Sequence, residues 1–180
     1  FIEKILYKPK IGYYSSKDPF GKNGDFITSP TISNLFSEII AIWLISTWEK
    51  IGKPKKFNFI ELGPGDGSLT KVVTKTLKKF PEINKAIKIY LYEKNTFLKK
   101  IQKKKIDNKN VKWITNFNSI KKGPAFFFGN EFFDAIPIKQ YSNINNIFFE
   151  KCYDVKNEVD VNETFIRSNK RDIAQIKTFK

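Results

Sequence analysis

Hydrophobic and polar residues follow one another in this chain with spacings that predict first a helix and then a series of short elements. Between residues 32 and 44, apolar side chains recur every three or four positions, as in a helix with one buried face. Ser29 is a suitable N-cap for this helix, and Pro30 suits its first position. Gly52 follows the last apolar positions, so we expect the helix to end near Lys50.

From residue 57 onward, short apolar runs alternate with segments of helical spacing. This alternation is typical of an α/β fold, in which a mostly parallel sheet carries helices on both faces. The run at 125–129 is apolar almost throughout, which predicts a strand buried on both faces. The predicted strands are 57–62, 87–93, 111–114 and 125–129, and the predicted helices are 68–79, closed by Pro81, and 96–105.

After Asp134 the pattern changes to strands joined by polar turns, which predicts a β-rich C-terminal part. The polar stretch at 157–169 is weakly patterned and is interpreted as a mobile segment or an insertion. The expected strands are 136–141, 147–153 and 163–166, with a turn at 142–146. We therefore divide the chain into an N-terminal lead-in with a loop and helix (1–56), a Rossmann-like core (57–141) and a β-rich insertion or start of a substrate region (142–180).

Three alternate glycines, Gly63, Gly65 and Gly67, follow Glu61 between the first predicted strand and the next helix. Glycine has no Cβ, so a ligand can approach the main chain closely at such a turn. A dinucleotide-binding loop has the spacing G-x-G-x-x-G, whereas here the third glycine comes one residue early. The pattern E-x-G-x-G-x-G resembles motif I of class I methyltransferases that use S-adenosylmethionine (SAM). A structural turn without a ligand is the alternative.

Acidic and amide side chains follow two further predicted strands. Ligands of open α/β sheets bind at the carboxyl ends of the strands, where Glu93 could accept the ribose hydroxyls of an adenosine. Asn130 and Glu131 could hydrogen-bond the cofactor or an incoming amine, and Glu131 with Asp134 could hold a cationic substrate. The alternatives are a solvated strand end at Glu93 and, after 125–129, a capped strand end with Phe132 and Phe133 in the core.

The composition excludes some kinds of active site, but it does not identify a binding partner. The net charge is +15, but only Arg167 and Arg171 are arginines, and a lysine-rich composition with much Ile, Asn, Phe and Tyr also fits A/T-rich codon usage. The charge therefore does not by itself predict a nucleic-acid partner. The absence of histidine excludes a Ser-His-Asp triad and histidine-ligated metal sites, and a single cysteine, Cys152, fits a reducing compartment. No apolar run approaches the roughly 20 residues of a membrane span.

Several motifs occur together and in order, and together they resemble the MidA family of SAM-dependent methyltransferases. The match covers about residues 6–141. The motifs are Gly12-Tyr13-Tyr14, Gly24-Asp25-Phe26-Ile27-Thr28-Ser29-Pro30, Glu61–Gly67, Glu93 with Leu98 and Gln102, and Asn130-Glu131-Phe132-Phe133-Asp134-Ala135-Ile136-Pro137.

The resemblance implies a class I methyltransferase fold, SAM as cofactor and a protein as substrate. Mitochondrial members of the family assist the assembly of respiratory complex I and dimethylate an arginine of one of its subunits. The implied compartment is the mitochondrial matrix for a eukaryotic chain and the cytoplasm for a bacterial one. By the same resemblance, Gly63, Gly65, Gly67 and Glu93 bind SAM, and Glu61 of the same loop motif is counted among the cofactor-binding residues. Asp25 and Thr28 reach SAM from a covering loop, and Asn130, Glu131 and Asp134 line the acceptor site.

Two departures from the family pattern stand in this sequence: Thr31 replaces a common Glu, and Asp66 replaces a common Arg before the third glycine. Family chains are also much longer, and this chain contains no methionine, so we expect it to be incomplete, without the last strands of the sheet. A non-catalytic assembly factor that binds a partner subunit, and an RNA methyltransferase, remain alternative functions.

Overall fold

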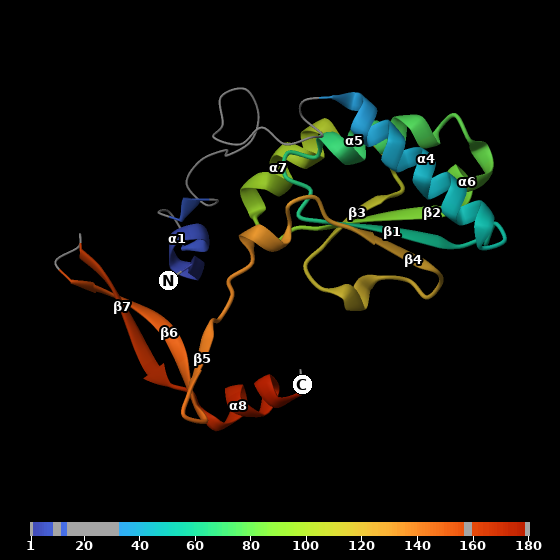
Figure 1. The fold of residues 1–180 in the computed structure, drawn as a ribbon. Helices are drawn as coiled ribbons and strands as arrows, with labels where there is room; N and C mark the ends of the chain where they lie inside the picture. The colour runs from blue at the N-terminus through green and yellow to red at the C-terminus, as the bar shows by residue number, and fades with distance from the viewer. Residues whose placement is uncertain (1, 9–11, 14–32, 157–159, 179–180) are drawn as a thin grey trace.

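A computed structural model describes residues 2–8, 12–13, 33–156 and 160–178. These residues form a parallel four-stranded sheet with helices and, after it in the chain, a three-stranded antiparallel sheet with one helix (Figure 1). The mixed α/β architecture with a β-rich C-terminal part confirms the predicted fold class.

The parallel sheet has the strand order β3-β2-β1-β4. Its strands are β1 (Phe57–Leu62), β2 (Ile87–Tyr92), β3 (Val111–Ile114) and β4 (Ala125–Phe128), each within one residue of the predicted bounds. β1 pairs with β2 on one side and with β4 on the other, with Glu61 opposite both Leu91 and Phe128. The direction in which strands are added therefore reverses between β1 and β4.

The long N-terminal helix, α4 (Asn34–Lys50), begins four residues later than the spacing predicts. Ser33 is its N-cap, with extended backbone and a side-chain oxygen that accepts from the Leu35 N–H. The predicted cap Ser29 and first position Pro30 lie outside the described residues. The end is as predicted, since Gly52 has φ +86° and its N–H donates to the Glu49 carbonyl.

The helices between the strands are α5 (Ser68–Leu77), α6 (Pro81–Ala86) and α7 (Thr96–Lys105). The last has the predicted bounds. The short helix α6 was not predicted, because Pro81 reads as the stop of the preceding helix while it in fact opens a new one at the first position. A further short helix, α1 (Ile2–Tyr7), lies near the N-terminus.

The main core lies between the sheet and α4, α5 and α6 (Figure 1). Right-handed crossovers from β1 to β2 and from β2 to β3 run in the same direction, which places their helices on one face. The other face has a small cluster built on Ile60, Tyr90 and Ile114, with the 3-10 turn η1 (Phe117–Ser119) beside it. The core residues of the first face are Ile40, Ala41, Leu44, Ile45, Trp48, Phe57, Phe59, Leu69, Val73, Leu77, Ile83, Ile87, Ile89, Leu91, Ile106 and Val111.

β4 lies at the edge of the described sheet, and the expectation that it is buried on both faces is wrong for these residues. Phe126 and Phe128 are half-buried against the main core, whereas Phe127 points to the other face and is 50% exposed. An all-apolar run cannot reveal this, because its pattern is the same whether or not a neighbour covers each face.

The antiparallel sheet consists of β5 (Tyr141–Ile144), β6 (Ile147–Lys156) and β7 (Asp160–Arg167), followed by the helix α8 (Lys170–Lys177). The expected strand at 136–141 is wrong, since the chain enters the sheet only at Tyr141. The expected turn at 142–146 is too long: it tightens to Asn145 and Asn146, both with positive φ, as a two-residue hairpin turn requires. The predicted strands 147–153 and 163–166 lie within β6 and β7. β7 thus takes up residues 160–167 of the stretch interpreted as mobile or as an insertion, and α8 was not predicted.

Lys139 connects this C-terminal part to the segment that leads into it. Its ammonium donates to Glu150 on β6 and to the buried Asp172 on α8. These hydrogen bonds raise the pKa of Lys139 and lower that of Asp172.

Among the described helices, none is long and apolar enough to cross a membrane.

Candidate cofactor and acceptor site

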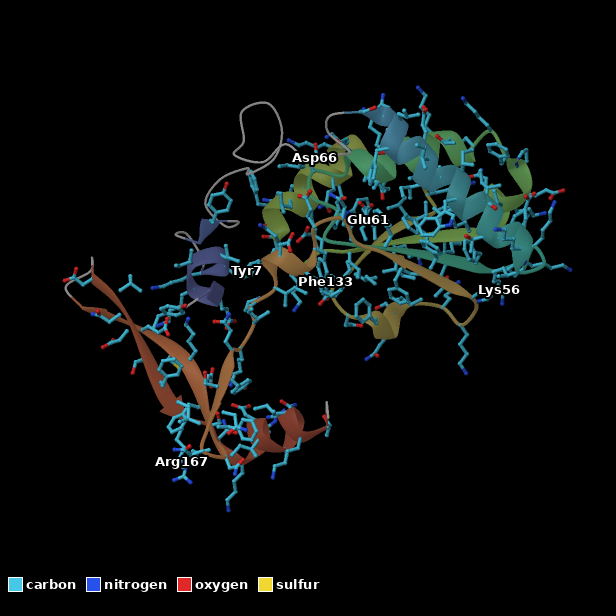
Figure 2. All side chains as sticks on the ribbon, viewed as in Figure 1. Tyr7, Lys56, Glu61, Asp66, Phe133 and Arg167 are labelled. Carbon is cyan, nitrogen blue, oxygen red and sulfur yellow. The ribbon has the colours of Figure 1, made fainter. Side chains whose placement is uncertain are left out.

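The carboxyl ends of β1, β2 and β4 meet at one end of the parallel sheet. This is also where strand order reverses between β1 and β4, the position at which open α/β sheets bind ligands. Figure 2 shows Glu61, Asp66 and Phe133 at this end and Lys56 at the opposite one. The predicted convergence of three strand ends is therefore seen in the structure.

The loop that follows β1 has the backbone conformation for which its glycines are needed. Gly63, Gly65 and Gly67 have φ of +62°, +53° and +82°. Gly67 is the N-cap of α5, so the unpaired N–H groups of that helix begin directly after the loop. The Gly63 N–H donates to the Tyr92 carbonyl over 3.1 Å, which joins the loop to the end of β2. A side chain at any of the three glycines would be strained.

Asp66 ties the loop to α7. One carboxylate oxygen accepts from the Ser68 N–H over 2.9 Å, and the other accepts from the Ser68 hydroxyl and from the Lys105 ammonium. Lys105 also donates to the Ser68 hydroxyl. A carboxylate at the start of α5 suits the positive end of the helix dipole. Asp66 stands where the family commonly has Arg, and here its carboxylate links the loop to Ser68 at the start of α5 and to Lys105 on α7.

Glu61 lies beneath α5, on the same face of β1 as Phe57 and Phe59. It is 4% exposed, and its carboxyl accepts a short hydrogen bond from the Thr70 hydroxyl. Burial raises the pKa of Glu61 to about 7, the Thr70 hydrogen bond opposes this shift, and the charge of Asp66 adds to it. Glu61 thus links the end of β1 to the first turn of α5, and a contact with the cofactor remains a prediction.

Glu93 follows β2 and faces the glycine loop. Its carboxylate is 8% exposed and accepts from the Asn95 N–H over 2.8 Å and from the Gln102 amide over 3.2 Å. Burial raises the pKa of Glu93, and both hydrogen bonds oppose that shift. A carboxylate offers about four acceptor positions, and the Asn95 and Lys94 N–H groups and the Gln102 amide use three of them, so Glu93 can still accept a hydroxyl.

Gln102 connects these parts, and no role was predicted for it from the sequence. It is 0% exposed, and its amide nitrogen donates to the Gly65 carbonyl over 2.7 Å as well as to Glu93. Its amide oxygen accepts from the Trp113 indole over 2.8 Å. A sequence signal did exist: Gln102 is the polar residue in the apolar stripe of α7, one turn after the buried Leu98.

The segment after β4 touches the glycine loop through Phe132. A Cβ added to Gly63 would lie 2.7 Å from the Phe132 ring, so the two segments are in direct contact. Phe132 is half-buried, but Phe133 is 74% exposed, so the interpretation of both rings as core packing is wrong for Phe133. Phe133 begins a 3-10 turn, η2 (Phe133–Ala135), and its ring stands edge-to-face against the Phe132 ring, with 5.6 Å between the centroids.

The three predicted acceptor residues lie in this segment and are more accessible than the cofactor residues. Asn130 is half-exposed, and Glu131 and Asp134 are exposed. Glu131 has φ +52°, a conformation that costs energy in a residue with a side chain and that often marks functional sites. The Tyr7 hydroxyl on α1 donates to the Ala135 carbonyl, which brings the N-terminal helix to this segment. Asp25 and Thr28 lie outside the described residues.

The described residues fit a nucleoside ligand. The glycine loop turns with three positive φ values, and the fixed carboxylate of Glu93 stands next to it. The missing Cβ of Gly63 makes room for the Phe132 ring, and that of Gly67 makes room for Ile106 and Gln102. An adenosine-containing ligand needs these two features, a bare backbone and an acceptor for its ribose hydroxyls. The fold and this arrangement define the class of α/β proteins that bind a nucleoside cofactor at the switch point of a parallel sheet.

Residues 39–178 match the family described as "Putative S-adenosyl-L-methionine-dependent methyltransferase". The match covers most of the chain, and the chain belongs to this family. This confirms the resemblance drawn from the motifs.

Curated relatives carry the name protein arginine methyltransferase NDUFAF7, mitochondrial. The homolog from Drosophila melanogaster is 31% identical over 93% of this chain and 43% of its own length, and the human protein is 29% identical over 92% and 43%. A crystal structure from Burkholderia thailandensis with bound S-adenosyl-homocysteine has a TM-score of 0.72 at 21% identity, over 98% of this chain and 47% of that chain. The chain thus spans less than half the length of the relatives that it matches, and the last comparison shows the fold alone.

Proposed function

We propose that this protein is a SAM-dependent methyltransferase that methylates an arginine side chain of a protein. The observation that carries the proposal is the junction of the glycine loop with Glu93 at the switch point of the sheet. Family membership and the names of the relatives support the choice of SAM and of arginine.

The cofactor half of the proposal assigns one role to each group. Gly63, Gly65 and Gly67 let the cofactor lie against bare backbone, and Glu93 accepts the hydroxyls of its ribose. Glu61, which accepts from Thr70 of α5, is proposed to contact the cofactor from the end of β1. Asp25 and Thr28 are proposed to reach the cofactor from the segment before α4. The cofactor, when bound, supplies an electrophilic methyl group on a positively charged sulfur.

The acceptor half rests on the segment after β4. Glu131 and Asp134 are exposed carboxylates next to the Phe132 contact with the loop, which suits them to orient a guanidinium by charge-assisted hydrogen bonds. Asn130 holds the same nitrogen by its amide oxygen. When the methyl group passes from the cofactor's sulfur to the guanidinium nitrogen, the methyl–sulfur bond would break and the sulfur would leave as a neutral thioether. The nitrogen would then release a proton, and one of the carboxylates would accept it.

The test of cofactor binding is calorimetry with S-adenosylhomocysteine on the full-length protein. Gly65→Val is expected to abolish binding, at least about a hundredfold, because the branched side chain occupies the ligand's space and is strained at positive φ. Gly52→Val is the matched control, since Gly52 also has positive φ but no atom within 4 Å of its added Cβ and a place far from the loop. Wild-type protein that does not bind would refute the proposal.

The test of the acceptor is mass spectrometry of respiratory complex I subunits from cells with and without the gene. We expect one arginine to lose its methyl groups when the gene is removed and to regain them with wild-type protein, but not with Gly65→Val. Assembly that survives Gly65→Val with no change in methylation would favour a non-catalytic assembly factor.

By analogy with the relatives, we propose the mitochondrial matrix as the compartment of a eukaryotic chain.

A further inference from the structure

We propose that Gln102 is the positioning residue of the cofactor site, acting through Glu93 and through the Gly65 carbonyl. This inference rests on the proposed function, because it concerns how the site for the ribose is held. Gln102 itself is 0% exposed and lies beneath the residues that would meet the ligand.

The first argument is that one amide nitrogen joins both halves of the nucleoside site. Its two hydrogens go to the Gly65 carbonyl at 2.7 Å and to the Glu93 carboxylate at 3.2 Å. These two groups lie on different elements, the loop after β1 and the end of β2. With both hydrogens used, the position of Glu93 relative to the loop is set by a single rigid group.

The second argument is that Trp113, which lies on β3, fixes which way round the Gln102 amide is oriented. The Trp113 indole on β3 can only donate, and it donates to the Gln102 oxygen over 2.8 Å. If the amide were turned over, its oxygen would face the Glu93 carboxylate and its nitrogen would face the indole N–H. Trp113 therefore makes only one orientation favourable.

The third argument is that the glycine loop packs directly against α7 at Gly67, where a side chain would not fit between them. A Cβ at Gly67 would lie 3.3 Å from the Gln102 Cγ and 2.9 Å from the Ile106 Cδ1. Below this contact, a buried amide that lost one partner would leave a polar atom unsatisfied. An apolar residue of similar size would fill the space but release both Glu93 and Gly65.

The experiment measures the affinity of full-length protein for S-adenosylhomocysteine in four forms: wild type, Gln102→Leu, Glu93→Gln and the double variant. We expect Gln102→Leu to weaken binding about tenfold in the wild-type background and less than about threefold in the Glu93→Gln background. Equal losses in both backgrounds, or unchanged affinity in Gln102→Leu, would overturn the inference. Wild-type protein that fails to bind would instead refute the proposed function.

Two further variants separate positioning from loss of structure. Leu98→Ala removes a buried apolar contact on the same helix and is expected to lower the melting temperature without changing affinity. If it weakens binding as much as Gln102→Leu does, Gln102 has a structural role only. Trp113→Phe keeps an aromatic ring but removes the N–H that donates to the Gln102 amide, and we expect about a threefold loss of affinity. An unchanged affinity would contradict the argument that Trp113 orients the amide.

Discussion

The two halves of the candidate site are built in different ways. On the donor side, Glu61, Glu93 and Gln102 are buried, and each has hydrogen-bond partners from neighbouring elements. On the acceptor side, Glu131 and Asp134 are exposed on a short turn after an edge strand. The donor side is therefore held by hydrogen bonds among the described residues, whereas the proposed acceptor carboxylates are exposed there.

The largest expected effect tests this contrast on its acceptor side. Asp134→Asn keeps the shape of the side chain and removes its charge, so we expect methyl transfer to fall by about a hundredfold or more. Affinity for S-adenosylhomocysteine is expected to stay the same. The measurement pairs a methylation assay with calorimetry on the full-length protein, and a parallel loss of both would show that the two halves are not independent.

The next effect concerns the buried carboxyl under the loop. The unfolded chain ionises Glu61 near pH 4.5, but the folded protein keeps it protonated up to about pH 7. The unfolded state thus binds fewer protons in this window, and the stability that Glu61 contributes below pH 4.5 is lost as the pH rises to about 7, by on the order of 3 kcal/mol.

Glu61→Gln should remove this part of the pH dependence, because the amide does not ionise. Chemical denaturation at several pH values between 4 and 8 measures it, with Glu131→Gln as the control on an exposed carboxyl. A wild-type protein whose stability is flat over this range would contradict the raised pKa.

A smaller effect is expected from the ribose side of the donor half. Glu93→Gln replaces a charged acceptor with a neutral one, so we expect affinity for S-adenosylhomocysteine to fall about tenfold. S-adenosylhomocysteine lacking both ribose hydroxyls serves as the control ligand, for which wild type and variant should differ little. An equal loss for both ligands would place Glu93 away from the ribose.

The smallest expected effect tests whether the ion pair between Lys105 and Asp66 contributes to cofactor binding or only to stability. Lys105→Ala removes the contact with Asp66, and the two side chains are 28% and 16% exposed. We expect a loss of stability of about 1 kcal/mol or less, since the pair is partly solvated, and little change in cofactor affinity. Lys104→Ala, on an exposed position of the same helix, is the control in thermal unfolding.

Local signals in the sequence were sufficient where one residue type has one structural use. Alternate glycines after an apolar run predicted the loop, and their positive φ values show why they are needed. The helix 96–105 was predicted to the residue, and in the structure Asn95 caps its start and Ile106 follows its end. Signals with two uses failed: Pro81 can end a helix or begin one, and a serine four residues further on competes with Ser29 as a cap.

The sequence by itself determined the parallel α/β pattern and the glycine loop, because both follow from spacing along a continuous segment, whereas SAM as the ligand came from the resemblance of its motifs to a known family. Only the tertiary structure decided which residues hold that loop. Gln102 reaches Gly65 across 37 residues of chain, and Trp113 and Glu93 join it from separate strands. Contacts of this kind depend on strand order and helix direction, and spacing along the chain does not record them.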